Sequence, residues 1–179
     1  MRRVAVVGTA GSGKTTVGRR LAAKLGLPFV ELDAIHWYRP GWVARDRASF
    51  RAEVEVRTSA EAWVVDGNYT SNVQDIVWSR ADTVLWLDLP RGSVMRQIVG
   101  RTLGRVLLRR QLWNGNRERL RNLLTTNPEE SVIAWSWHQH GRKRRQYEAA
   151  MDDPRWRHVR FIRLRSRREV RQLLASLPE

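Results

Sequence analysis

One segment constrains this chain more than any other, because it matches the pattern G-x-x-x-x-G-K-[ST] in full. The segment is Gly8-Thr9-Ala10-Gly11-Ser12-Gly13-Lys14-Thr15. A β-branched run precedes it over 3–8, and a helical pattern begins at Lys14. Glycines permit backbone conformations that side chains block, so successive N–H groups in such a loop converge on an anion. We therefore expect a strand–loop–helix unit that binds phosphate groups.

The residue types after the glycines specify the ligand further. Lys14 supplies a mobile positive charge for the β- and γ-phosphate oxygens, and the Thr15 hydroxyl is placed to complete the coordination of Mg²⁺. We predict a site for ATP with Mg²⁺, with GTP open as the alternative nucleotide. The nucleotide-binding residues expected here are Gly8, Thr9, Ala10, Gly11, Ser12, Gly13, Lys14, Thr15 and Thr16.

Short apolar runs alternate with helical patterns along the rest of the chain. The expected strands are 3–8, 28–32, 63–65, 83–89 and 159–164. The expected helices are 14–25, 45–61, 91–110, 117–124, 131–151 and 167–177. Near-continuous apolar strands separated by helices indicate a parallel sheet covered on both faces. We predict an α/β fold, a three-layer α/β/α sandwich of the P-loop NTPase class, in one domain spanning 1–179.

The charge of the chain is unevenly distributed. The formal net charge is +15, and 91–179 carry 21 basic and 8 acidic side chains. Two explanations stay open: an arginine-rich composition, or a surface that faces polyanions. The absence of cysteine excludes a disulfide framework and fits a reducing cytoplasm. No apolar run is long enough to span a bilayer, so we expect a soluble protein without a membrane partner.

Two aspartates follow expected strands on the side where the phosphate loop lies. Asp33 comes after the second strand and Asp66 after the third. Ligands of open parallel sheets gather at the carboxyl ends of strands. An aspartate that ends a buried strand beside such a loop is the arrangement that holds Mg²⁺. We predict Thr15 and Asp66 as the metal-binding pair; the alternative for either aspartate is a helix cap or a turn.

Several segments together resemble the adenylate-kinase-like P-loop kinases, and within them the branch described as adenylate kinase-related or DNA topology modulation proteins. They are the phosphate loop, Leu32-Asp33 with Trp37 and Gly41-Trp42, Asp66-Gly67-Asn68-Tyr69, 81–90, and Leu164-Arg165-Ser166. The resemblance implies strand order 2-3-1-4-5 and an acceptor-binding region after the second strand. It also implies an arginine-bearing helical lid inserted at about 101–145.

The same resemblance implies roles for single residues. Arg101 aligns with a lid arginine that contacts the phosphates being transferred. Asp33 matches the substrate-side acid of shikimate- and gluconate-kinase-like relatives, which orients or deprotonates an acceptor hydroxyl. Arg165 and Ser166 follow the last strand, where the family's loop packs against the base. Nucleoside-monophosphate kinases continue their Asp-Gly with Phe-Pro-Arg, whereas this chain has Asn68-Tyr69-Thr70, which argues against AMP as acceptor.

The leading hypothesis is an ATP-dependent phosphotransferase that acts on a small-molecule or nucleotide acceptor, with Lys14, Asp33 and Arg101 as catalytic residues. Two alternatives stay open: a nucleotide-regulated DNA-binding, topology-modulating protein, and a slow ATPase without an acceptor. Nucleic acid is the less favoured partner, and both monomer and homodimer are open. Trp37 and Trp42 fall in the acceptor region, where they either form an aromatic wall or pack in the core.

Overall fold

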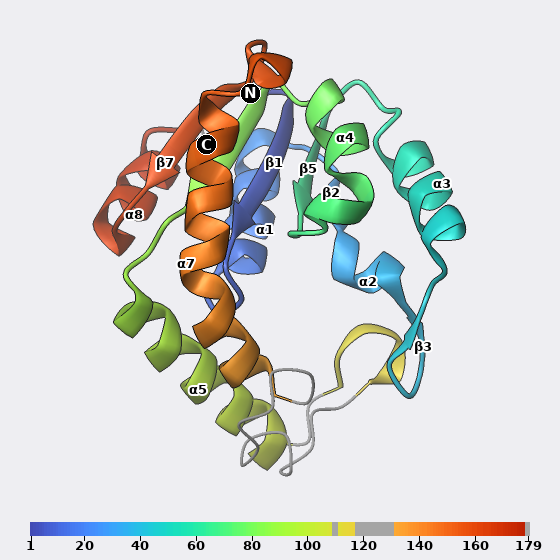
Figure 1. The fold of residues 1–179 in the computed structure, drawn as a ribbon, viewed down its shortest axis with the longest axis vertical. Helices are drawn as coiled ribbons and strands as arrows, with labels where there is room; N and C mark the ends of the chain where they lie inside the picture. The colour runs from blue at the N-terminus through green and yellow to red at the C-terminus, as the bar shows by residue number, and fades with distance from the viewer. Residues whose placement is uncertain (109–110, 117–130, 178–179) are drawn as a thin grey trace.

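The computed structural model describes residues 1–108, 111–116 and 131–177. Its centre is a parallel sheet of five strands in the order β2-β5-β1-β6-β7 (Figure 1). These strands are β1 (Arg3–Gly8), β2 (Phe29–Glu31), β5 (Trp63–Asp66), β6 (Thr83–Leu87) and β7 (Arg160–Leu164). Counted along the chain within this sheet, the order is 2-3-1-4-5, as expected. A separate antiparallel pair, β3 (Trp37–Arg39) and β4 (Val43–Ala44), accounts for the gap in numbering.

Helices cover both faces of the sheet, so the α/β class and its three layers are confirmed. The helices are α1 (Lys14–Leu25), α2 (Leu32–His36), α3 (Arg47–Arg57), α4 (Thr70–Arg80), α5 (Arg91–Leu107), α7 (Val132–Met151) and α8 (Arg167–Ala175). Two 3-10 turns complete the described elements, η1 (Trp113–Gly115) and η2 (Pro154–Trp156).

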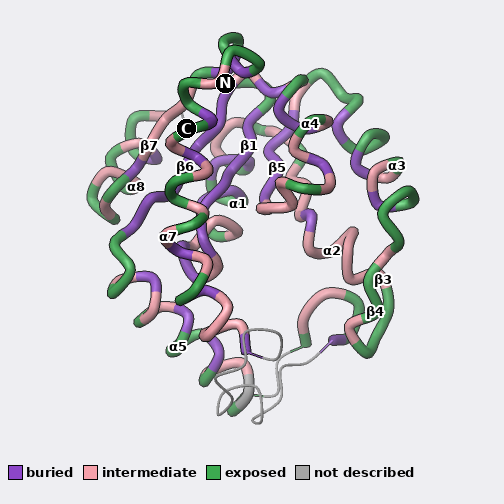
Figure 2. The backbone as a smooth tube through the Cα atoms, in the orientation of Figure 1, coloured by how far each residue is buried: buried purple, intermediate pink, exposed green. Residues whose placement is uncertain are grey.

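The alternation of side chains along β1 divides the core in two. Val4 and Val6 pack with α1 and α8 on one face, and Ala5 and Val7 pack with α4 and α7 on the other. Figure 2 shows the central strands as buried throughout and the outer helices as exposed on one side. Trp63 and Trp86, which lie in two of the expected strands, are 0% and 3% exposed. Because all five strands are parallel, their carboxyl ends lie at the same edge of the sheet.

The helices α2 and α4 and the strands β3 and β4 were not predicted. The helix α4 places Val73, Val77 and Trp78 on the core, but no side chain caps its first residue, so the sequence carries no start signal. The short helix α2 and the β3–β4 pair fall in the segment expected to be an irregular acceptor region. The expected helix 45–61 is shorter in the structure, because α3 ends at Arg57.

The expected lid lies only partly within the described residues. Its start lies in the second half of α5, and its end, at about 145, lies within α7. The expected helix 117–124 and the arginines at 109 and 110 lie outside the described residues. The extent of the lid, and the single domain of 1–179, therefore stay predictions.

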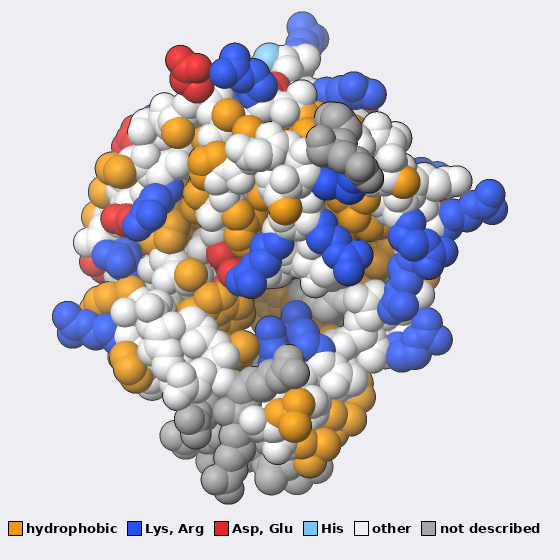
Figure 3. Space-filling view, turned by 180° about the vertical axis from the view of Figure 1, so that it is seen from behind, with side chains coloured by type: hydrophobic (Ala, Val, Ile, Leu, Met, Phe, Trp, Pro, Cys, Tyr) orange, Lys and Arg blue, Asp and Glu red, His pale blue; other side chains and the backbone are white. Residues whose placement is uncertain are grey.

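The surface is strongly basic. On the face shown in Figure 3, Lys and Arg side chains are spread widely while Asp and Glu side chains are few, and the face is hollowed in its lower half. No described helix is both long enough and apolar enough to cross a membrane.

The last helix begins with a reciprocal cap. The Ser166 hydroxyl accepts a hydrogen bond from the Glu169 backbone N–H, at 3.2 Å. The Glu169 carboxylate in turn accepts from the Ser166 hydroxyl at 3.0 Å and from the Arg165 N–H at 2.8 Å. Ser166, expected at the nucleotide base, is therefore engaged in starting α8.

Replacing Ser166 by alanine should lower the free energy of unfolding by about 1 kcal/mol, because the first turn of α8 loses its cap. Urea unfolding of the apo-protein measures this. Ser79→Ala is the matched control: Ser79 is exposed and donates only to the Ile76 carbonyl, so its loss should cost less than about 0.5 kcal/mol. Equal effects of the two substitutions would argue against a capping role.

Candidate functional site

The phosphate loop leaves β1 in a conformation that only glycine tolerates. Gly11 and Gly13 have φ of 82° and 90°. At Gly8, whose φ is 148°, a Cβ atom would lie 2.7 Å from the Leu87 carbonyl oxygen; at Gly11 it would lie 2.8 Å from the Ile98 Cβ. The neighbouring strand β6 and the helix α5 thus press directly on the loop backbone. The glycine pattern reflects this close approach as well as the backbone angles.

A side chain from the next strand connection fixes the start of the loop. The Asn68 amide oxygen accepts from the Gly8 N–H at 3.1 Å, and its nitrogen donates to the Gly8 carbonyl. The buried Tyr147 hydroxyl donates to the same amide oxygen at 3.0 Å. From α7, the Ser136 hydroxyl also donates to the Ala10 carbonyl at 2.9 Å. The loop is therefore braced from two other elements of the chain.

Three predicted residues come together where the loop meets α1. The Lys14 ammonium donates to the Thr9 carbonyl at 3.1 Å, so the side chain folds back beneath the loop. The Thr15 hydroxyl donates to the Asp66 Oδ2 at 2.6 Å. Asp66 is 3% exposed, and its Oδ1 has no hydrogen-bond partner.

Burial controls the ionisation of this pair. It raises the pKa of Asp66 to about 6, although the Lys14 charge and the Thr15 hydrogen bond favour the carboxylate. Burial likewise lowers the pKa of Lys14, which Asp66 and Asp33 oppose and Arg101 reinforces. Each shift reflects a charge that water solvates only in part.

The residues present fit magnesium bound with a nucleotide. The unpartnered Asp66 Oδ1 and the Thr15 hydroxyl are hard oxygen donors of the type Mg²⁺ prefers, and they lie beside the loop that would hold its phosphates. The described part of the chain contains no cluster of three or more His, Cys, Asp and Glu side chains. Such a cation would thus take its remaining ligands from nucleotide and water.

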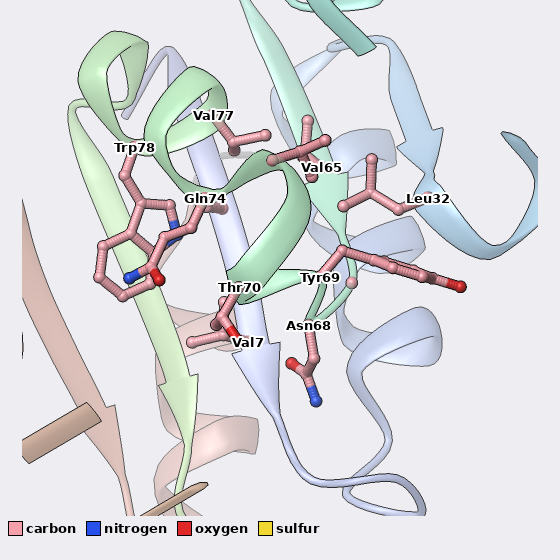
Figure 4. Close-up of a pocket in the computed structure, with 12 residues that line it drawn as sticks. Val7, Leu32, Val65, Asn68, Tyr69, Thr70, Gln74, Val77 and Trp78 are labelled. Carbon is pink, nitrogen blue, oxygen red and sulfur yellow. The ribbon is translucent and has the colours of Figure 1, made fainter. Parts of the chain in front are cut away.

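Asp33 lies at the same edge of the sheet, on α2. The Tyr69 hydroxyl donates to its Oδ1 at 2.7 Å, and burial together with this aspartate raises the pKa of Tyr69 well above its usual range. Figure 4 shows that Asn68 and Tyr69 point in different directions from one turn, with the Tyr69 ring beside Leu32. This turn therefore contacts two parts of the site: Asn68 bonds the phosphate loop at Gly8, and Tyr69 bonds Asp33. The cavity beneath it, about 10 Å³, holds no more than one water.

The remaining predicted residues are placed less closely. Arg101 is exposed on α5. It is near enough to the site for its positive charge to lower the pKa of Lys14. Thr16 is exposed on α1. Arg167, two positions after Arg165, is linked to the phosphate loop through Gln97. With the Gln97 amide oriented to suit its neighbours, its oxygen accepts from the Arg167 guanidinium at 2.9 Å, and its nitrogen donates to the Gly11 carbonyl at 3.2 Å.

Several contacts escaped the sequence analysis. Asn68 and Tyr69 were noted as part of the family resemblance and as a departure from the nucleoside-monophosphate kinase pattern, without a role of their own, yet each bonds a predicted site residue. Nothing in the sequence marked Ser136 or Tyr147, which lie in a helical run of mixed polarity. The one available signal is their hydroxyl groups, because a buried hydroxyl needs a hydrogen-bond partner.

Comparisons with known proteins give the family. A family model described as shikimate kinase matches 10–52. The chain is 31% identical over 147 residues to the shikimate kinase of Pseudomonas fluorescens (strain Pf0-1), covering 74% of this chain and 75% of that protein. The chain belongs to the shikimate kinase family. It is therefore a P-loop kinase whose cofactors are ATP and Mg²⁺.

Solved structures agree on the fold of this kinase. A shikimate kinase from Bacteroides thetaiotaomicron superposes with a TM-score of 0.55 at 17% identity, over 97% of this chain and 94% of that one. One from Acinetobacter baumannii, in complex with shikimate, gives 0.51 at 20% identity, over 98% and 89%. The resemblance to adenylate-kinase-like P-loop kinases is confirmed for the fold and for the P-loop kinase class. The comparisons favour the shikimate kinases over the adenylate kinase-related branch, and they do not support the DNA-binding alternative.

The raised pKa of Asp66 predicts an unusual pH dependence. Its carboxyl favours the folded state while it is protonated, so its contribution to stability is complete below about pH 4 and is lost as the pH rises through about 6. The wild type should therefore lose roughly 1–3 kcal/mol relative to Asp66→Asn between these pH values.

Urea unfolding of both apo-proteins from pH 4 to 8 measures this difference, because carboxylates elsewhere titrate equally in the two. Asp75→Asn is the control, since the Arg51 hydrogen bond lowers the pKa of Asp75 and the opposite slope is expected. A pH-independent difference between wild type and Asp66→Asn would contradict the assignment.

Proposed function

We propose that this kinase transfers the terminal phosphoryl group of ATP to a hydroxyl of a small polyhydroxylated acid, with shikimate as the first candidate. The observation that carries this proposal is the position of Asp33. Its carboxylate lies at the sheet edge that also holds Lys14 and Asp66, close enough to affect the pKa of Lys14. A hydroxyl bound at Asp33 would thus face the phosphates gripped by the loop.

Each residue of the site then has a defined task. The loop amides and the Lys14 ammonium hold and neutralise the phosphate oxygens, and Arg101 adds charge from α5 as negative charge develops in the transition state. Asp33 accepts the proton of the acceptor hydroxyl, and Tyr69 holds this carboxylate in orientation. Thr15 and Asp66 would hold Mg²⁺, which when bound offsets the charge of the phosphates.

The acceptor's carboxylate would also need a cation. Arg45 is a half-buried arginine beside α2, and its Nε donates to the Ile35 carbonyl at 3.1 Å. Its guanidinium lies 4.9 Å from the centre of the Tyr38 ring. We assign Arg45 as the partner of an acceptor carboxylate, because a guanidinium fork binds a carboxylate with two parallel hydrogen bonds. This acceptor assignment also draws support from the family and from the solved shikimate complex.

The first test is transfer itself. With labelled ATP and Mg²⁺, the wild type should phosphorylate shikimate, and Lys14→Ala should reduce kcat/KM by roughly 10²–10³-fold or more, because a charge aimed at the transferring phosphate is lost. Lys24→Ala, in the last turn of the same helix, is the control and should retain activity. A screen of further hydroxylated acids would follow. Label released only as free phosphate, whatever acceptor is offered, would refute the proposal.

The second test separates the base from its support. Asp33→Asn should lower kcat by about 10²–10⁴-fold, since an amide cannot accept the proton. Tyr69→Phe keeps the carboxylate and removes only its hydrogen bond, so the loss should be much smaller, on the order of tenfold. Steady-state kinetics with ATP at saturation measure both. An Asp33→Asn enzyme as active as Tyr69→Phe would exclude Asp33 as the base.

A further inference from the structure

A short segment that follows α5 lies against the acceptor region. Residues Trp113–Asn116, which we call the strap, include η1 and run beside α2 and β3 (Figure 1, yellow). Asn114 of the strap and Ala34 of α2 are separated by 80 positions in the sequence. The contact is thus a tertiary one, made by a segment that lies between the expected helices 91–110 and 117–124.

Asn114 holds the strap to α2 and β3. Its side-chain amide donates to the Ala34 carbonyl at 3.1 Å and to the Trp37 carbonyl at 2.6 Å. Its backbone is left-handed, with φ of 52°, which asparagine tolerates better than most residues. The amide therefore ties together the two backbone positions that bracket the end of α2.

Asn116 holds the strap to the β3–β4 turn. The side chain, only 2% exposed, accepts from the Trp42 N–H at 2.6 Å and donates to the Arg39 carbonyl at 3.1 Å. Trp42 has a φ of 59°, unusual for a tryptophan. The buried amide stabilises this conformation and with it the direction of the Trp42 ring.

Trp113 completes an aromatic surface near Asp33. Its indole N–H donates to the Glu31 carboxylate at 2.7 Å. The rings of Trp37 and Trp42 are 5.5 Å apart and those of Trp42 and Trp113 are 6.3 Å apart, both in edge-on contact. All three indoles are only half-buried.

The strap therefore bonds to the chain on either side of Asp33 in the sequence, at Glu31 two positions before it and at Ala34 directly after it. A hydrogen bond fixes the indole edge of Trp113, and Trp42 and Trp37 are held to the strap through their backbone groups. The three rings keep part of their surface open.

We propose that Trp113 is a specificity-determining residue of the acceptor site, and that Asn114 and Asn116 are positioning residues that hold the aromatic wall in place. This inference rests on the proposed function. A wall of indoles binds the C–H face of a ring, whereas a flexible open-chain polyol must first lose rotational freedom to lie flat against it. The structure thus favours a cyclic polyhydroxylated acid over an open-chain one.

The test compares shikimate, a ring, with gluconate, an open chain, offered as acceptor or as competitor. Trp113→Ala should raise the KM for shikimate roughly tenfold, while kcat and the KM for ATP change less than about twofold. The constant for gluconate should also change less than about twofold. Trp137→Ala, at a tryptophan 50% exposed on α7, is the matched control and should leave the KM for shikimate unchanged.

A second variant covers the case in which Trp113→Ala unfolds. Asn114→Gly keeps the left-handed backbone accessible and removes only the two amide hydrogen bonds, so the KM for shikimate should rise several-fold with the KM for ATP unchanged. Parallel losses for shikimate, gluconate and ATP would overturn the assignment and reduce the strap to a structural brace. A wild type that phosphorylates no acceptor would instead refute the proposed function, and this inference with it.

Discussion

The structure depends on how tightly the end of β1 is enclosed. Gly8 touches the backbone of β6 through Leu87, and both of its own backbone groups bond the Asn68 amide. These contacts restrict the backbone of the loop to one conformation, and α1 begins directly after it. The nucleotide site is therefore a product of the sheet, and residues that never touch phosphate determine its shape.

The same enclosure creates the electrostatic tension of the site. Lys14 and Asp66 lie in surroundings from which water is largely removed, and burial shifts the pKa of each towards its neutral form. Attraction between the two offsets only part of this cost. Stability and the proposed function thus make opposite demands on Asp66. Its negative charge weakens the folded protein without ligand, yet the proposed role of Asp66 in holding Mg²⁺ requires that charge.

The sequence predicted well what is local and poorly what is distant. The loop motif, the aspartates at strand ends and the strand order all follow from patterns within short segments, and the structure places Thr15 against Asp66 as those patterns require. The hydrogen bond from Tyr69 to Asp33 did not follow, because a side-chain direction depends on packing that no spacing records. The helix α4 was missed for want of a cap, and the capping of α8 by Ser166 was not predicted.

The bracing of the loop by Tyr147 has a consequence for the order in which the protein folds. Gly8 is made early in translation, yet its supports Asn68, Leu87 and Tyr147 leave the ribosome much later. A nascent chain cannot complete these contacts until Tyr147 has been synthesised. Contacts between such distant positions form slowly, because the intervening chain must be ordered first. The bracing of the phosphate loop is therefore completed late in folding, after the sheet and α7 have come together.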